Sequence, residues 1–498
     1  MNSAMLTASD PLTPSRGILA SMKNWRLNAV PFLAYVLYLT LALSIVAKGG
    51  FLAQDFFIHL TFARRLFSGS FASELAGATN PPLLFLLAAT AMRIFGEVLG
   101  IKLLAVAFAF LNCCALHLFW LCSARLLPQA PRLLALLFTA TLPAFVTTSV
   151  VFAADALVCL PFFAFCYINL RLLEAPQQPT IKMLIGSSAV QVLGGLAKFS
   201  FLGIAPAALI FSGYLIYEKK CRPPKAFAVL LLLFLIPSAA NFWILKSLQG
   251  TTAHEIQFPT LTGEMTFRSL LWPYPRDLEL FSAPPYFDQI KSGGSQIQVS
   301  ADGDAQIGGR PGFTILVNNR YSYPALLNLS INSDVLNITH RRMVDSNAFA
   351  AAGQLKHGNQ LFQEASVILG SLYSLLVFIS VPALFFSASR ATFAATKYAV
   401  ASSWNEGALN SSPVDFSLAV LLPALTFYGL IVGLLPFVGG EVYYGGYWLP
   451  RLVLPALPVF GLAAFWLVAR ASQSRLLWYF FAALTILKVC FHICLQIL

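Results

Sequence analysis

An acidic residue, Asp55, stands in the first polar stretch after a long apolar run, and its carboxylate could do acid–base chemistry. Placing a carboxylate in mid-bilayer costs about 2.5 to 3.5 kcal/mol on insertion scales, so the apolar run must end before Asp55 and leave it at the membrane surface. A carboxylate in that position can accept the proton of an attacking hydroxyl group. The alternative role is structural, because Asp is also a preferred residue at the N-terminal cap of a helix.

The residues that follow Asp55 have a helical pattern. One apolar stripe consists of Phe56, Leu60, Ala63 and Phe67, and an adjoining stripe consists of Asp55, His59 and Phe62. Gly69 then ends the pattern. The sequence therefore predicts a short amphipathic helix on the membrane surface, with the Asp55 carboxylate at its N-terminus. His59 lies one turn from Asp55 and can exchange a hydrogen bond with it, with a packing role as the alternative.

Three further charged residues stand at predicted surface ends of apolar runs: Asp155, Lys198 and Arg451. Asp155 lies where an apolar run should reach the surface, and Asp is also a typical residue at the start of a helix. A lone lysine such as Lys198 is costly in a membrane unless it meets an anion, which favours a lipid phosphate. Arg451 follows several aromatic residues that are typical of a membrane interface. Its guanidinium fork also suits phosphate oxygens, and we favour that role over snorkelling.

The segment from Asp55 to Pro81 resembles the first external loop of the GT-C glycosyltransferases, a family that includes protein mannosyltransferases, aminoarabinose transferases and arabinofuranosyltransferases. In that family an acid after the first span is followed by a helix with an arginine, a glycine and an Asn-Pro or His-Pro step. The corresponding residues here are Asp55, Arg64, Gly69 and Asn80-Pro81. The family often has two adjacent acids, whereas this chain has Asp55 alone.

The resemblance extends over residues 30 to about 215 and again over 440–465, where Arg451 precedes Leu-Pro-Ala-Leu-Pro. It implies a sugar donor on a polyprenyl phosphate (undecaprenyl or dolichyl) and an acceptor hydroxyl on a lipid, glycan or protein. Asp55 is then the expected catalytic base of an inverting single displacement. The implied substrate-binding residues are His59, Arg64, Asp155, Lys198 and Arg451. No cofactor is predicted, and a divalent cation near Asp55 and Asp155 is the open alternative.

The composition is that of a polytopic membrane protein, since 58% of the 498 residues are hydrophobic and 10% are charged. The net charge of +12 comes from scattered basic residues, which argues against a nucleic-acid partner. None of the eight cysteines lies in the large polar segment, and their spacing suggests neither a disulfide framework nor a metal site.

The apolar runs predict an all-α membrane protein with about 11 transmembrane helices and surface helices in the first external loop. The resemblance implies that this fold is of the GT-C type. The predicted spans lie near 30–47, 102–122, 133–151, 155–171, 181–197, 200–217, 226–246, 366–388, 414–437, 451–469 and 476–494. The shorter apolar run 81–95 carries Arg93, and we expect it to be a second surface helix.

Basic residues concentrate in alternate loops, such as the loop with Lys219, Lys220, Arg222 and Lys225. The positive-inside rule then places the N-terminus in the cytoplasm, and Asp55 and the C-terminus outside. We expect a bacterial inner membrane with a periplasmic active site, or alternatively the endoplasmic reticulum membrane.

Four parts of the chain follow from this topology: a cytoplasmic segment 1–29, a membrane core 30–246 with a catalytic loop 48–101, an external loop domain 247–365, and C-terminal membrane helices 366–498. Short strands between turns are expected within 292–312. The external domain could select the acceptor or serve only as a structural cap. The predicted function is a membrane glycosyltransferase, with a transporter or flippase of lipid-linked sugars as the alternative.

Overall fold

The structure is a computed structural model of the 498-residue chain. It describes residues 15–47, 56–67, 81–175, 178–249, 297–299, 305–307, 310–311, 369–370, 372–387, 413–434, 453–471 and 475–497. The candidate residues Asp55 and Arg451, and nearly all of the external segment 247–365, lie outside the described residues.

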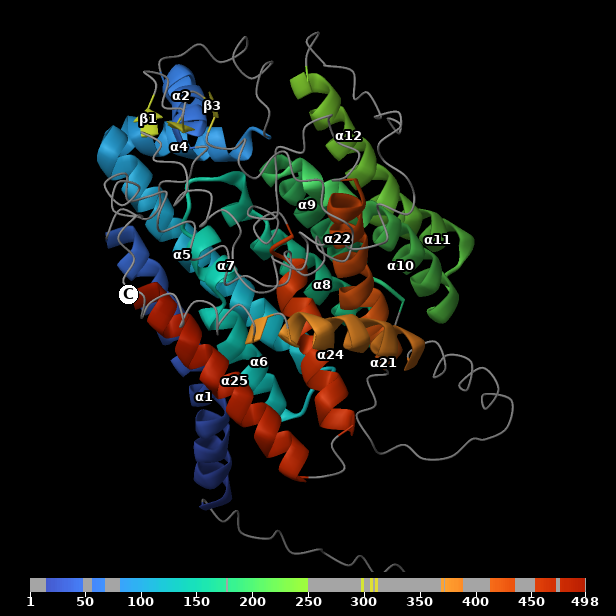
Figure 1. The fold of residues 1–498 in the computed structure, drawn as a ribbon. Helices are drawn as coiled ribbons and strands as arrows, with labels where there is room; N and C mark the ends of the chain where they lie inside the picture. Colours follow the sequence, from blue (N-terminus) through green and yellow to red (C-terminus); the bar gives the residue numbers. More distant parts are fainter. Residues whose placement is uncertain are drawn as a thin grey trace, which may run out of the picture.

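The chain forms a bundle of helices (Figure 1). Its first half contains α1 Ser15–Ala47, α2 Phe56–Phe67, α4 Leu83–Phe95, α5 Glu97–Ser123, α6 Gln129–Thr141, α7 Pro143–Thr148, η1 Ala154–Leu157, α8 Cys159–Glu174, α9 Ile181–Ala197, η2 Phe199–Ile204, α10 Ala205–Glu218, α11 Pro223–Leu230, η3 Leu231–Leu235 and α12 Ile236–Gln249. The C-terminal part contains a helix Leu372–Ser387, then α21 Pro413–Phe416, η5 Ser417–Leu421, α22 Leu422–Leu434, α24 Ala456–Ala471 and α25 Arg475–Ile497.

The described parts of the apolar runs predicted to span the membrane are largely helical, although several runs are not a single α-helix. The predicted span 133–151 divides into α6 and α7 at Pro143. Proline has no amide hydrogen and clashes with the preceding turn, so it begins a helix far better than it continues one. Among the described residues, five helices are long and apolar enough to cross a membrane. The protein is a helical membrane protein, and the total of about 11 spans stays a prediction.

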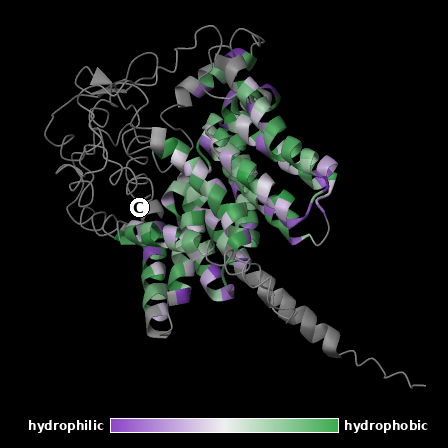
Figure 2. Cartoon of the chain, turned by 90° about the vertical axis from the view of Figure 1, so that its right-hand side faces the viewer, coloured by the Kyte–Doolittle hydropathy of each residue, from purple (hydrophilic) through white to green (hydrophobic). Residues whose placement is uncertain are grey.

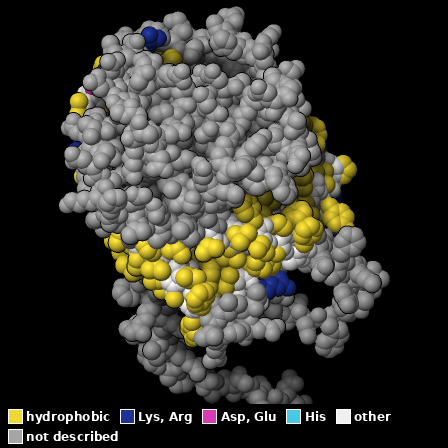
Figure 3. All heavy atoms as spheres, in the orientation of Figure 1, with side chains coloured by type: hydrophobic (Ala, Val, Ile, Leu, Met, Phe, Trp, Pro, Cys, Tyr) yellow, Lys and Arg dark blue, Asp and Glu magenta, His cyan; other side chains and the backbone are white. Residues whose placement is uncertain are grey.

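The main core lies where α1, α5, α6, α8, α22 and α24 meet, and it is built largely from phenylalanine, leucine and alanine. Hydrophobic residues cover the body of the bundle, whereas hydrophilic residues gather toward helix ends (Figure 2). On the face shown in Figure 3, the described side chains form a mainly hydrophobic band. Large apolar side chains such as Phe227, Phe242 and Trp243 are exposed, as expected for helices that contact lipid.

Polar side chains cross-link the helices within this apolar body. The π-helical turn η3 interrupts the regular backbone hydrogen bonding between α11 and α12. The side-chain amide of Gln191 on α9 donates to the carbonyl of Leu233 in η3 over 2.9 Å. Asn241 on α12 in turn donates to the carbonyl of Gln191 over 3.2 Å. These bonds matter because an unpaired backbone group has no water partner inside a membrane.

The two helices predicted for the first external loop are present as α2 and α4. In Figure 1, α4 lies crosswise at the upper end of the bundle, and α2 packs on it. The predicted apolar stripe of α2 was partly wrong, because Phe67 is exposed while His59 and Leu66 are buried with Leu60 and Ala63. The buried face is rotated toward His59 because α2 packs against α4 and not against a flat membrane surface.

Short strands predicted in the external segment are also present. They are β1 Ile297–Val299, β2 Ala305–Ile307 and β3 Arg310–Pro311, which pair as an antiparallel sheet in chain order. Ile297 is the partner of Ile307, and Ile307 is also the partner of Arg310. The sequence between these strands is mostly glycine and aspartate, which is the pattern that predicted short strands here.

Candidate functional site

The candidate site lies under the layer formed by α2 and α4. A separate apolar cluster joins this layer to the bundle, with Leu60 and Ala63 of α2, Phe85 and Met92 of α4, and Phe108 of α5 among its buried members. The same cluster includes residues of the segment around η1 and Ala197 at the end of α9. The surface layer, η1 and the end of α9 thus form one packed unit.

Two predicted site residues, Asp155 and Lys198, form an ion pair in this unit. Lys198 Nζ donates a hydrogen bond to Asp155 Oδ1, although the residues are 43 positions apart in the chain. Both side chains are well buried, with exposed fractions of 5% for Asp155 and 13% for Lys198. Each therefore has a partner of opposite charge in a poorly solvated place, which offsets part of the cost of burial.

Local structure explains how the two charges meet. Asp155 lies in the 3-10 turn η1, and Lys198 directly follows α9 with extended backbone. The buried amide of Asn112 on α5 donates to the carbonyls of Ala156, over 2.7 Å, and of Phe108, over 3.0 Å. Asn112 thereby attaches η1 to α5 and fixes the height of Asp155 along the bundle.

This pairing changes the argument for Lys198. The sequence predicted an anionic partner because an isolated ammonium group is costly in a membrane, and a lipid phosphate was the expected anion. The carboxylate of Asp155 already supplies a negative charge. Lys198 therefore does not need a phosphate to compensate its charge. A contact between Lys198 and phosphate stays a prediction.

His59 is buried, with an exposed fraction of 2%, between the rings of Phe85 and Phe152. Its Nδ1 lies 3.1 Å from the carbonyl oxygen of Phe152, three residues before Asp155. His59 therefore connects α2 to the segment that carries Asp155. Asp55, which directly precedes α2 in the chain, lies outside the described residues, so the expected contact between His59 and Asp55 stays a prediction.

Arg64 near the end of α2 forms a two-point ion pair with Glu97 at the start of α5, with Nε 2.8 Å from Oε2. The hydrogen bonds that Arg64 donates to the Glu97 carboxylate raise the pKa of Arg64 above its ordinary value. Both side chains are substantially exposed, at 55% and 40%, so the pair contributes at most about 1 kcal/mol to stability. Binding of substrate by Arg64 stays a prediction.

Sequence analysis missed three contributors to this region: Glu97, Asn112 and the carbonyl of Phe152. A signal existed for Asn112, because an amide side chain within the apolar run 102–122 needs hydrogen-bond partners. No comparable signal marked a backbone carbonyl. Among the residues that the structure describes, no three His, Cys, Asp or Glu side chains group closely enough to hold a metal ion.

Comparisons with known proteins bear on this region. No curated protein matches the chain. A solved structure, ArnT from Cupriavidus metallidurans bound to undecaprenyl phosphate, aligns with 88% of this chain and 78% of its own at 10% identity and a TM-score of 0.32. At that TM-score the likeness does not establish a common fold.

The family model described as dolichyl-phosphate-mannose-protein mannosyltransferase matches residues 79–243, about a third of the chain. The matched segment begins just before Asn80-Pro81, ends within α12, and includes both Asp155 and Lys198. The resemblance predicted from the sequence is therefore confirmed over this segment, which is similar to the protein mannosyltransferase family.

Proposed function

We propose that the protein transfers a sugar from a polyprenyl-phosphate carrier to a hydroxyl group on a lipid, glycan or protein outside the cytoplasm. The observation that supports this most strongly is the buried Asp155–Lys198 pair, set under α2 and α4 within the segment that matches the mannosyltransferase family. A buried ion pair stabilises a fold little compared with apolar residues of the same volume, so its presence favours a functional role.

In the proposed reaction Asp55 is the general base. The acceptor oxygen attacks the anomeric carbon while its proton passes to the Asp55 carboxylate, and the bond between that carbon and the phosphate oxygen breaks. The bonding electrons leave on the phosphate, so one base suffices and the anomeric centre is inverted. No second carboxylate is needed as an acid, because a phosphate paired with cations is a good leaving group.

Lys198 and Arg451 are the proposed cations for the carrier phosphate. An ammonium group has three donors, so one lysine can serve a carboxylate and a phosphate together. Asp155 then orients Lys198 and keeps its ammonium charged. Arg451 offers a planar fork that matches two phosphate oxygens. Arg64 and His59 are proposed to position the donor or acceptor through α2.

Reconstitution tests this function. The purified protein in liposomes is given a panel of polyprenyl-phosphate sugars and candidate acceptors, and both carrier release and product mass are measured. Release of carrier together with a glycosylated product supports the transferase. Movement of intact lipid-linked sugar across the bilayer, without a product, would instead identify a flippase and overturn the proposal.

A further inference from the structure

Arg132 on α6 lies at the end of the bundle opposite the candidate site under α2 and α4 (Figure 1). Among the residues that the structure describes, Arg132 makes no hydrogen bond and no ion pair, and its Nε is buried without a partner. Two other arginines near this end, Arg125 and Arg171, each pair with Glu174. A half-buried guanidinium without an anion is unfavourable, which points to a ligand.

Neighbouring aromatic side chains hold Arg132 in place. Its guanidinium carbon lies 3.4 Å from the centroid of the Trp120 ring on α5, which is the arrangement of a cation–π contact. Stacking covers one face of the guanidinium and directs its N–H groups sideways. Tyr35 lies on α1, which packs against α6, and its hydroxyl lies 3.1 Å from His117 Nδ1 on α5. Three helices thus contribute polar groups to one place.

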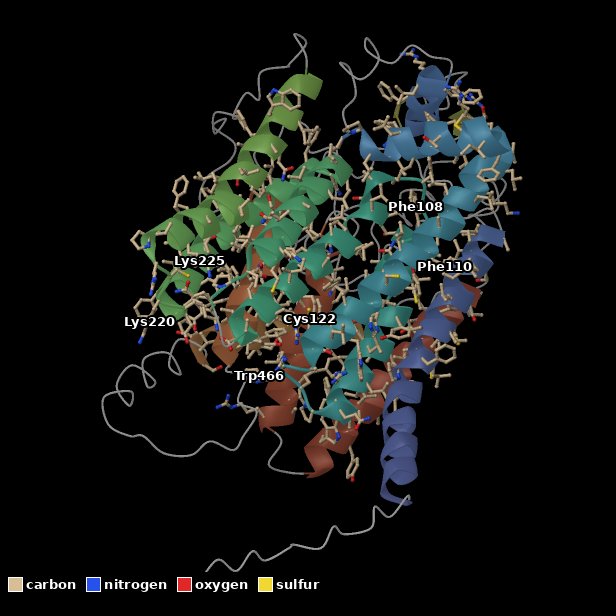
Figure 4. The ribbon with its side chains drawn as sticks, turned by 180° about the vertical axis from the view of Figure 1, so that it is seen from behind. Phe108, Phe110, Cys122, Lys220, Lys225 and Trp466 are labelled. Carbon is tan, nitrogen blue, oxygen red and sulfur yellow. The ribbon has the colours of Figure 1, made fainter. Side chains whose placement is uncertain are left out.

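These groups lie near the level expected for lipid headgroups. A 27-residue helix such as α5 is roughly 40 Å long, against a hydrocarbon thickness of about 30 Å. His117 is near the end of α5, and Arg132 is in the first turns of α6, so both adjoin the connection between these helices. In Figure 4, Cys122 marks this lower end of α5, whereas Phe108 and Phe110 lie toward α4. His117 itself is exposed on the outside of the bundle.

We propose that Arg132, Tyr35 and His117 bind the phosphate of an anionic phospholipid in the membrane leaflet opposite α2 and α4. The guanidinium edge and the phenol donate to phosphate oxygens, and the acyl chains lie along the exposed apolar surface between α1 and α5. A lipid is the occupant that the surroundings favour, because the site faces outward at headgroup depth. This site is separate from the proposed active site and does not depend on it.

Native mass spectrometry of the full chain in a mild detergent tests the proposal. Phosphatidylglycerol and phosphatidylcholine with the same acyl chains are titrated separately, and the bound lipid per chain is counted. Phosphatidylglycerol should bind in preference, and Arg132→Gln should weaken its binding at least roughly tenfold, the scale of one lost charge-assisted hydrogen bond. Arg132→Lys, which keeps the charge without the fork, and Tyr35→Phe should each lose part of the affinity.

Arg125→Gln is the matched control, because it removes the same charge at the same end from a residue that already pairs with Glu174. It should leave phosphatidylglycerol binding near that of the parent. Equal loss in both glutamine variants, or no loss in Arg132→Gln, would overturn the proposal. Should Arg132→Gln fail to fold, unchanged binding in both Arg132→Lys and Tyr35→Phe would do the same. Displacement of the lipid by millimolar inorganic phosphate would identify a free phosphate site instead.

Discussion

Among the candidate site residues that the structure describes, Asp155 and Lys198 form a buried ion pair with each other. Each residue was selected from the sequence for a separate role, and the structure places the two side chains in contact. A buried charge that loses its partner is strongly destabilising, whereas replacement of both partners by apolar residues is often close to neutral. Stability and function can therefore be separated at this pair.

Asp155→Leu or Lys198→Met alone should lower the free energy of unfolding by about 3 kcal/mol, because each removes an oppositely charged partner from a buried charge. The double variant should recover most of that loss. If the pair also contacts the donor, the double variant should bind polyprenyl-phosphate sugar poorly even though its stability is restored. Unfolding in detergent and donor titration measure the two effects, and normal donor use by a stable double variant would make the pair purely structural.

Asp55→Asn should reduce sugar transfer at least about a hundredfold, because the amide keeps the size of the side chain but cannot accept a proton. Insertion into the membrane and donor binding should stay near the parent values. Initial rates with saturating donor and acceptor provide the measurement. Asp10→Asn, in the N-terminal segment, is the control and should be fully active. A transfer rate within a few-fold of the parent rate would contradict the role of Asp55 as general base and leave it the role of a helix cap.

Helices α2 and α4 act as one element that covers the end of the bundle. His59, Leu60 and Ala63 attach α2 to α4 and to the segment before Asp155, while Arg64 attaches it to the start of α5. The exposed ion pair at Arg64 contributes little energy, so the apolar contacts and the buried His59 hydrogen bond hold this layer. In the proposed function, we expect the lipid-linked donor to bind at this layer, beside the Asp155–Lys198 pair.

The π-helical turn η3 depends on a side chain from another helix. Gln191→Leu should lower the free energy of unfolding by about 1 to 3 kcal/mol, because the Leu233 carbonyl loses its donor in a place without water. Thermal or denaturant unfolding in detergent provides the measurement. Gln178→Leu is the matched control, since Gln178 also donates to a backbone carbonyl, that of Lys220, but on the exposed surface. Equal effects of the two variants would argue against the role of Gln191.

At the scale of the whole molecule, we propose that the membrane core catalyses sugar transfer and that the external segment selects the acceptor. Replacing residues 292–312, which contain β1 to β3, with a short Gly/Ser linker should change acceptor affinity or selectivity. Slow hydrolysis of the carrier-linked sugar should continue, because the proposed catalytic groups lie elsewhere in the chain. Acceptor titration and carrier release are the two measurements, and parallel loss of both in a well-inserted protein would contradict this division.

The sequence by itself determined the helical membrane class, the location of the apolar helices that the structure describes, the strands near residues 297–311 and the resemblance to the GT-C glycosyltransferases. These features depend on composition, short-range periodicity and local motifs, all of which involve residues that are close together in the sequence. The break at Pro143 was also readable, since proline acts on its own helix.

Only the tertiary structure decided which charges pair and which face of α2 is buried. Asp155 and Lys198 are 43 residues apart, and Arg64 and Glu97 are 33 residues apart, so no local pattern joins them. For His59 the sequence left open a hydrogen bond with Asp55 or a packing role, and only the structure shows its ring beside Phe85 of α4 and Phe152. Long-range contacts such as these follow from how the helices pack, because only packing brings distant backbone groups and charges within hydrogen-bonding distance.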